Sequence, residues 1–241
     1  MSWGWDIDAR WHEALGWWWS LLGSGIQRPG SSCFDSGNFA QMLMESSKLL
    51  KLYASGQRCF DGESLIRADF SHHQLAGIHL GSCHLVGINF CQANLRRASF
   101  EGSDLSNAQF WRADCARADL NDSILHGASL LRVDFSRASL RRAKLFGADM
   151  RMAVLTNATL QAANLTRADL RFANLQGADL RYANLRQADL SGANLAGVQL
   201  YQTVLTGAAF GQVDLSQVDL SGAILSDRTS DEILMPSRRQ G

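Results

Sequence analysis

A large apolar residue recurs at every fifth position of this 241-residue chain, from Leu65 to Leu225, and the period holds for 33 consecutive positions without an insertion or deletion. The central residue is Leu in 25 of these units, and Phe, Met or Cys fills the others. A small residue, most often Ala, stands two positions earlier, so the unit reads A-(D/N)-L-x-x. A period of five fits neither an α-helix nor a β-strand, because their side chains repeat every 3.6 and 2 residues.

A unit with two inward positions predicts a chain that turns a corner after each unit and closes a coil after four corners. We therefore expect every fifth residue from 65 to 225 to be buried. Glu63 and His73 break the small inward column, and both fall in the first coil, where the interior is expected to be still open. Glycine occupies ten of the positions two after the central residue, which is typical of corners that need a positive φ.

This repeat resembles the pentapeptide-repeat family, and the resemblance covers residues 63–227. It implies a right-handed, quadrilateral β-solenoid of about eight coils, in which each coil contacts only its neighbours. Some members of the family protect DNA gyrase by imitating duplex DNA with an elongated acidic surface. The family is also common in photosynthetic bacteria, and the resemblance therefore allows a role near a photosynthetic or membrane complex.

The segments that flank the repeat have a different character. Residues 1–34 form a tryptophan-rich segment and linker, with six of the seven tryptophans in the first 19 residues. Residues 35–62 carry an apolar stripe at helical spacing and are predicted to form an amphipathic helix that caps the coil. Residues 228–241 hold a capping-box pattern ahead of Pro236, which predicts a short C-terminal capping helix and a tail.

The N-terminal tryptophans allow three interpretations. They cap the first coil, they contact a partner protein, or they lie peripherally in a membrane interface. The apolar run of residues 14–26 is too short to cross a bilayer. Trp17, Trp18 and Trp19 would span about 200° of a helix, so a single packing surface cannot bury all three rings. We expect at least one of them to contact a partner.

Charge composition argues against a nucleic-acid partner. The chain has 23 Lys and Arg and 23 Asp and Glu, and residues 63–227 hold 15 of each. This balance disfavours the alternative of a DNA-mimicking, gyrase-protecting protein, because only residues 187–227 are acidic without any base. The five cysteines lack paired spacing, and Cys83 and Cys115 occupy inward positions. We therefore expect a cytoplasmic protein, free or peripheral to a membrane, the thylakoid if the source is photosynthetic. The oligomeric state stays open.

Patterns of catalytic, cofactor-binding or metal-binding residues are absent from the sequence. His72, His73, His79 and His84 would lie on different sides of a regular coil, so they cannot converge on one ion. Neither a nucleophile–base pair nor a phosphate-binding glycine loop is apparent. We expect no enzyme, no cofactor and no metal.

The exterior is patterned instead. Positions twenty apart share a face, so Arg97, Arg117 and Arg137 should stack in a column that Asp114 and Asp134 partly offset. On the next corner apolar side chains alternate with arginines, a composition typical of protein interfaces. The alternative is that single apolar residues are exposed there without consequence. The sequence predicts a non-enzymatic scaffold or assembly protein that presents a rigid solenoid to a protein partner. The predicted binding residues are Trp111, Arg112, Leu131, Arg132, Arg151, Met152, Arg171 and Phe172, together with Trp17, Trp18 and Trp19.

Overall fold

The computed structural model describes residues 46–216 and 218–225 of the chain. Residues 46–54 are helical. Leu49 is buried in the same apolar core as the coils, and the Tyr53 hydroxyl donates a 2.8 Å hydrogen bond to the Ala76 carbonyl. The described helix therefore packs against the first coil, and residues 35–45 of the predicted capping helix lie outside the described residues.

The boundary between helix and coil lies earlier than the sequence predicts. The helix ends at residue 54 rather than continuing to 62. His79 N–H donates to the Arg58 carbonyl at 2.7 Å, and Phe60 N–H donates to the His79 carbonyl at 2.8 Å. Residues 58–60 thus already belong to the first coil, because the second coil offers them backbone partners that a helix could not reach.

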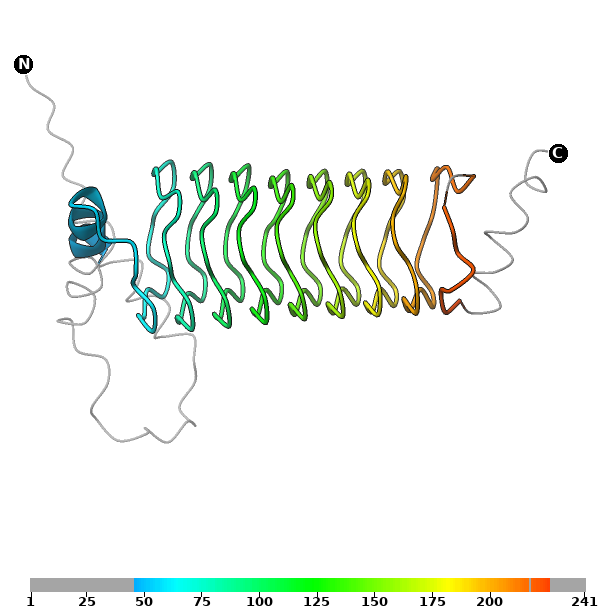
Figure 1. The fold of residues 1–241 in the computed structure, drawn as a ribbon, viewed down its shortest axis with the longest axis horizontal. Coiled ribbons are helices and arrows are strands. Elements are labelled where there is room, and N and C mark those ends of the chain that lie inside the picture. Colours follow the sequence, from blue (N-terminus) through cyan, green and yellow to red (C-terminus); the bar gives the residue numbers. More distant parts are fainter. Residues whose placement is uncertain (1–45, 217, 226–241) are drawn as a thin grey trace, which may run out of the picture. The chain divides into compact units, whose positions relative to one another are not determined.

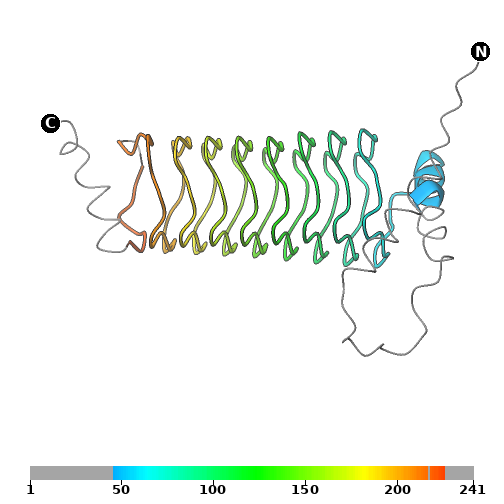
Figure 2. The ribbon, with the colours of Figure 1, turned by 180° about the vertical axis from the view of Figure 1, so that it is seen from behind.

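Beyond the helix the chain forms stacked coils of four sides. From residue 59 to residue 189, each outward residue before a central position makes a parallel bridge to the residue 20 positions on, and seven successive bridges join Cys59 to Gln199 along one side. Within the described residues no strand is longer than a single bridge, because corners leave only three residues on each side. Figures 1 and 2 show these coils stacked in register from opposite viewpoints.

The corners from residue 62 to residue 212 each contain a left-handed residue. Each fifth residue from 62 to 212 has a positive φ, and 21 of these residues are not glycine. The Leu65 carbonyl accepts a 3.1 Å hydrogen bond from Ala68 N–H, and the positive φ of Arg67 between them matches the third position of a type II turn. Left-handed backbone costs a residue with a side chain about 1–2 kcal/mol. Backbone hydrogen bonds between successive coils offset this cost, since the Arg67 N–H donates to the Val86 carbonyl of the next coil at 2.9 Å.

The Asp or Asn of the repeat completes the corner. Each regular unit has five backbone N–H groups, and backbone carbonyls accept hydrogen bonds from four of them. The fifth N–H belongs to the first corner residue and has no backbone acceptor. An Asx side chain accepts this fifth N–H where it is present, as Asp134 Oδ1 does from Ser136 N–H at 2.8 Å and Asn184 Oδ1 does from Arg186 N–H at 3.1 Å. The side chain thus supplies the acceptor that the turn itself lacks.

The central residues are buried in the coils from Leu65 to Leu205, as predicted. The expectation is wrong for the last four, because Phe210, Leu215, Leu220 and Leu225 are only partly buried. Among the described residues, no backbone bond joins residues 194–200 to 213–219, and bonds between these coils resume where Gln202 N–H reaches the Gly222 carbonyl at 2.6 Å and Leu205 N–H reaches the Ile224 carbonyl at 2.8 Å. Figures 1 and 2 show this last coil, in orange, standing away from the regular stack.

The first coil is open, as the two exceptions in the inward column suggest. Glu63 is exposed, and His73 is half-buried with its ring edge-on to Phe70 at 6.4 Å. Cys83 and Cys115 are buried, which confirms their inward positions. None of the helices in the described residues is long and apolar enough to span a membrane. The tryptophan-rich segment, including Trp17, Trp18 and Trp19, and the C-terminal helix predicted within 228–241 lie outside the described residues.

Candidate protein-binding surface

One corner of the middle coils carries most of the predicted binding residues. We call it the strip corner. It is formed by residues 111–112, 131–132, 151–152 and 171–172 of four successive coils. Met152 and Phe172 are 44% and 57% exposed, whereas Trp111 and Leu131 are half-buried. The four predicted apolar side chains thus form two neighbouring columns of one corner, Trp111 with Leu131 and Met152 with Phe172, and the second pair is the more accessible.

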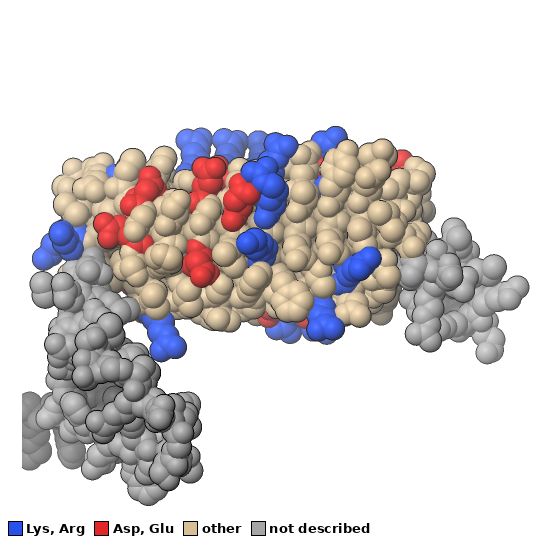
Figure 3. Space-filling model, turned by 90° about the horizontal axis from the view of Figure 1, so that it is seen from below, with Lys and Arg blue, Asp and Glu red and all other residues tan. Residues whose placement is uncertain are grey.

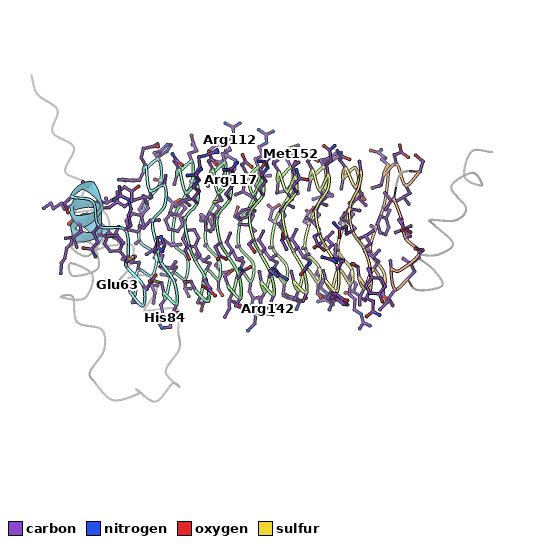
Figure 4. All side chains as sticks on the ribbon, viewed as in Figure 1. Glu63, His84, Arg112, Arg117, Arg142 and Met152 are labelled. Atoms are coloured by element: carbon purple, nitrogen blue, oxygen red, sulfur yellow. The ribbon has the colours of Figure 1, made fainter. Side chains whose placement is uncertain are left out.

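Two arginines of the strip corner lie against its apolar groups. The Arg112 guanidinium carbon lies 4.8 Å from the centre of the Trp111 ring, and Arg132 Nε lies 3.3 Å from the Met152 sulfur. Both arginines are exposed. Their side chains are thus held by weak contacts and remain available to a carboxylate. In Figure 4 the labelled Arg112, Arg117 and Met152 lie along one edge of the solenoid, opposite Glu63, His84 and Arg142.

The other two arginines of this corner are already paired. Arg151 makes a bidentate contact with Asp149, with both N–O distances 2.8 Å, and its Nε also lies 3.7 Å from Asp169. Arg171 repeats this arrangement with Asp169 and then Asp189. The predicted residues Arg151 and Arg171 therefore belong to a column of alternating charges that ties three coils together.

The neighbouring arginines shift the pKa values of the aspartates in this column. The hydrogen bond from Arg151 lowers the pKa of Asp149. Partial burial acts to raise the pKa of Asp169, but hydrogen bonds from Arg171 outweigh it, and the pKa is lowered. Both carboxyls are therefore ionised and engaged near neutral pH, and little of their charge is left for a ligand.

A glycine of the next coil makes room for the most exposed aromatic ring of the strip. A Cβ atom at Gly192 would lie 2.6 Å from Phe172 Cδ1, closer than side-chain carbons approach one another. Gly192 also has a positive φ of 68°. The ring thus rests on the backbone of the following coil, which limits its rotation while leaving its outer face exposed.

The next corner carries an arginine column, formed by Arg97, Arg117 and Arg137, all exposed. The coil sides that precede these three arginines are joined by parallel bridges, so they stack one above another. Asp114 on the same side is paired with Arg96 at 3.0 Å. The sequence predicts this column. In the structure, the column lies at the corner that ends the coil side beginning at Arg112.

Sequence reasoning missed a second aromatic pair. Tyr182 and Tyr201 are 55% and 54% exposed, and their rings meet edge to face at 5.8 Å. They occupy the two positions of one corner in successive coils and are 19 residues apart, so a period of twenty does not place them in one column. This corner lies opposite the strip corner in the coil, so the tyrosines do not extend the strip.

The space-filling view shows the solenoid from below, the side on which Figure 4 labels Arg142. Figure 3 shows acidic and basic side chains together over the N-terminal half of that face, and mostly uncharged surface toward the C-terminal end. Arg142 and Asp122 form a bidentate pair with both N–O distances 2.6 Å. Charge on this side of the described solenoid is thus mixed rather than of one sign.

Comparison with known proteins identifies the repeat. The family model for pentapeptide repeats matches in 8 copies over residues 74–112, 113–151, 153–192 and 183–222. The chain belongs to the pentapeptide-repeat family. No curated protein matches the sequence significantly.

Several solved structures of pentapeptide-repeat proteins are similar to this chain. HetL from the cyanobacterium Nostoc sp. strain PCC 7120, involved in heterocyst differentiation regulation, is 29% identical over 75% of this chain and 97% of that chain, with a TM-score of 0.34. QnrB1, a plasmid-mediated fluoroquinolone resistance protein, is 22% identical over 73% and 95%, with a TM-score of 0.46. A protein from the Arabidopsis thaliana thylakoid lumen is 26% identical over 58% and 69%, with a TM-score of 0.18.

The interior of this pentapeptide-repeat protein offers little chemistry. The buried polar side chains in the described part of the chain are Ser103, Ser123 and Thr203, and each hydroxyl donates to a backbone carbonyl. Burial raises the pKa of the Cys115 thiol, which therefore stays protonated and packs as an apolar group. Over residues 46–216 and 218–225, His, Cys, Asp and Glu do not gather in groups of three that could hold a metal ion.

Proposed function

We propose that this protein is a non-enzymatic scaffold or assembly protein that binds a protein partner through the strip corner. The observation that carries the proposal is the exposure of Met152 and Phe172 in adjacent coils, on the same corner as Trp111 and Leu131. Aromatic, Met and Arg side chains are enriched in protein interfaces, and a few of them supply most of the binding energy.

Rigidity of the scaffold supports this role. Both the coil-to-coil ladder and the bidentate pairs of Arg151 and Arg171 fix the backbone on either side of the exposed side chains. A surface that is ordered before binding loses less conformational entropy when a partner docks. The solenoid therefore presents its strip corner with little reorganisation.

DNA mimicry is the less well supported alternative. A mimic needs an uninterrupted row of carboxylates, and the column of Asp149, Asp169 and Asp189 is interleaved with Arg151 and Arg171. The alternative keeps one favourable feature, since Asp214 and Asp219, unlike Asp189, have no basic partner among the described residues. Inhibition of DNA supercoiling by gyrase, with and without the protein, tests it directly.

A reducing compartment suits the cysteines. The four within the described residues, at positions 59, 83, 91 and 115, are all unpaired. Unpaired buried thiols are typical of proteins that fold in the cytoplasm. We accordingly place the scaffold in the cytoplasm or at the cytoplasmic surface of a membrane complex.

The test removes the accessible apolar groups. Full-length protein carrying Met152→Ser and Phe172→Ser is compared with the wild type in quantitative affinity capture from cells of the source organism. Both side chains are largely exposed, so the melting temperature should stay within about 2–3 °C of the wild type. Proteins that the wild type captures specifically should be recovered at least about tenfold less, because hot-spot residues carry 2 kcal/mol or more.

A matched control separates this surface from general stickiness. The variant with Tyr182→Ser and Tyr201→Ser removes two aromatic rings of similar exposure from a different corner. It should capture the same proteins as the wild type. Equal recovery by all three proteins, at equal stability, would contradict the proposal.

A further inference from the structure

Five arginines of the middle coils have no carboxylate partner in the structure. They lie on the two corners that flank one side of the solenoid, and the described residues offer none of them an ion pair within 4 Å. All five are exposed. We call this set the arginine patch, and it consists of Arg97, Arg112, Arg117, Arg132 and Arg137.

The backbone sets the spacing of the patch. Arg112 and Arg117 stand at the two ends of one side, and Arg132 and Arg137 repeat that arrangement one coil on, because Asp114 bridges Asp134 in parallel register. Coils stack about 4.8 Å apart, so three coils bring the five guanidinium groups onto a surface about 10 Å long. Like charges this close repel one another, and an anionic partner relieves the repulsion.

The patch differs from the rest of the described solenoid in how many unpaired arginines it gathers. Arg96, Arg142, Arg151, Arg171 and Arg181 each pair with an aspartate at 2.6–3.0 Å. The other arginines of the coils without a carboxylate partner are spread along the described solenoid, whereas the patch gathers five on two adjacent corners; these scattered arginines include Arg67, Arg141, Arg167 and Arg186. Net charge balance over the whole sequence conceals this local excess.

Resting on the proposed function of the strip corner, we infer that the arginine patch selects an acidic, extended segment of the partner protein. Arg112 and Arg132 belong to both surfaces, and their guanidinium groups lie beside the Trp111 ring and the Met152 sulfur. A bound segment can thus place carboxylates on the patch and apolar side chains on the strip.

A polypeptide fits the patch better than a nucleic acid does. Asp114 and Asp134 lie on the outward position of the side between the two arginine corners. A phosphate backbone that crossed this side would approach both carboxylates. An extended peptide carries its charges on chosen side chains, about 6.7 Å apart on one face, and can put uncharged residues over the aspartates.

The experiment measures binding of defined probes to full-length protein by fluorescence anisotropy. Three labelled twelve-residue peptides are used: Glu alternating with Leu, Glu alternating with Ser, and Lys alternating with Leu. The Glu-Leu peptide should bind most tightly, the Glu-Ser peptide more weakly, and the Lys-Leu peptide not detectably. The Kd for the Glu-Leu peptide should rise as salt is added, because screening weakens exposed charge pairs.

Two variants of equal net charge locate the site. Arg97→Gln with Arg117→Gln and Arg137→Gln should weaken binding of the Glu-Leu peptide about tenfold, since three exposed charge pairs are lost together. The control combines Lys144→Gln, Arg167→Gln and Arg186→Gln on another part of the solenoid, where these cations are also exposed. Its Kd should stay within about twofold of the wild type.

Several outcomes would overturn the inference. Equal weakening in both variants would assign binding to overall charge. Tighter binding of a 20-base-pair DNA duplex or of phosphatidylserine vesicles than of the Glu-Leu peptide, lost in the patch variant, would assign the patch to a nucleic acid or a lipid surface.

The two proposals can fail separately. If cellular capture depends on Met152 and Phe172 but is unchanged in the patch variant, the strip binds a partner and only the acidic segment is refuted. If the patch variant loses the peptide while the strip variant captures normally, the strip corner is refuted as the partner site.

Discussion

At the scale of single residues, the Asx position carries more of the fold than its exposure suggests. Asp or Asn stands before the central residue in many units, and its Oδ1 accepts the one N–H that the corner leaves without a backbone acceptor. Asn184 does so for Arg186, whereas Thr159 occupies the equivalent position and makes no such bond. The polar residue of the repeat is therefore a structural element of the turn.

Replacing Asn184 by Ala should lower the free energy of unfolding by about 0.5–1.5 kcal/mol, because the N–H of Arg186 loses its acceptor. Thr159→Ala at the matching position should change it by less than about 0.5 kcal/mol. Chemical denaturation followed by circular dichroism measures both. A cost for Thr159→Ala equal to that of Asn184→Ala would show that the hydrogen bond is not the source.

At the scale of elements, columns of side chains couple successive coils. The column of Asp149, Arg151, Asp169, Arg171 and Asp189 alternates in sign, and each arginine contacts the aspartate of its own coil and, more distantly, that of the next. Periodicity of twenty residues makes such columns possible. The charged side chains of a column either pair with one another or stay free for a ligand. The outcome depends on how far each side chain extends across the corner.

Acid should weaken this column selectively. The pKa values of Asp149 and Asp169 are lower in the folded protein than in the unfolded chain. Their contribution to stability is therefore complete above the unfolded value of about 4 and is lost as the pH falls through the lowered folded values. The melting temperature of the wild type should drop more steeply between about pH 5 and pH 2 than that of Asp149→Asn with Asp169→Asn.

Asp134→Asn provides the control for that titration, because Asp134 accepts a backbone N–H but has no arginine partner in the described residues. The melting curve of this variant should follow the wild type across the same pH range. If the melting temperatures of all three proteins fell in parallel as the pH is lowered, the ion-pair column would not be the source of the acid sensitivity.

At the scale of the whole solenoid, order decreases toward the C-terminal coil. Within the described residues, regular bonds join successive coils as far as Gly192 N–H and the Gly211 carbonyl, and the next bond between the last two coils is the one from Gln202 N–H to the Gly222 carbonyl. The four central residues of this coil are only partly buried, so less apolar surface holds it in place. Coils in a solenoid are stabilised by their neighbours, and a terminal coil has a neighbour on one side only.

Hydrogen exchange should follow this gradient. Leu155 N–H and Leu160 N–H each donate to the next coil at 2.7 Å, whereas Leu195 N–H and Leu200 N–H have no such bond within the described residues. The amides of Leu195 and Leu200 should exchange at least about tenfold faster than those of Leu155 and Leu160, because local opening is least costly where the ladder is incomplete. Uniform protection across the four amides would contradict the gradient.

The five-residue period by itself determined the family, the inward columns and the sharing of faces at twenty-residue spacing, because a register without insertions leaves the chain one way to turn its central apolar residues inward. Tertiary structure decided the rest. Whether Arg151 is paired and Arg132 is free depends on distances across a corner, and the splayed last coil depends on lost backbone partners. The period is the same in both cases, so the sequence pattern alone could not distinguish them.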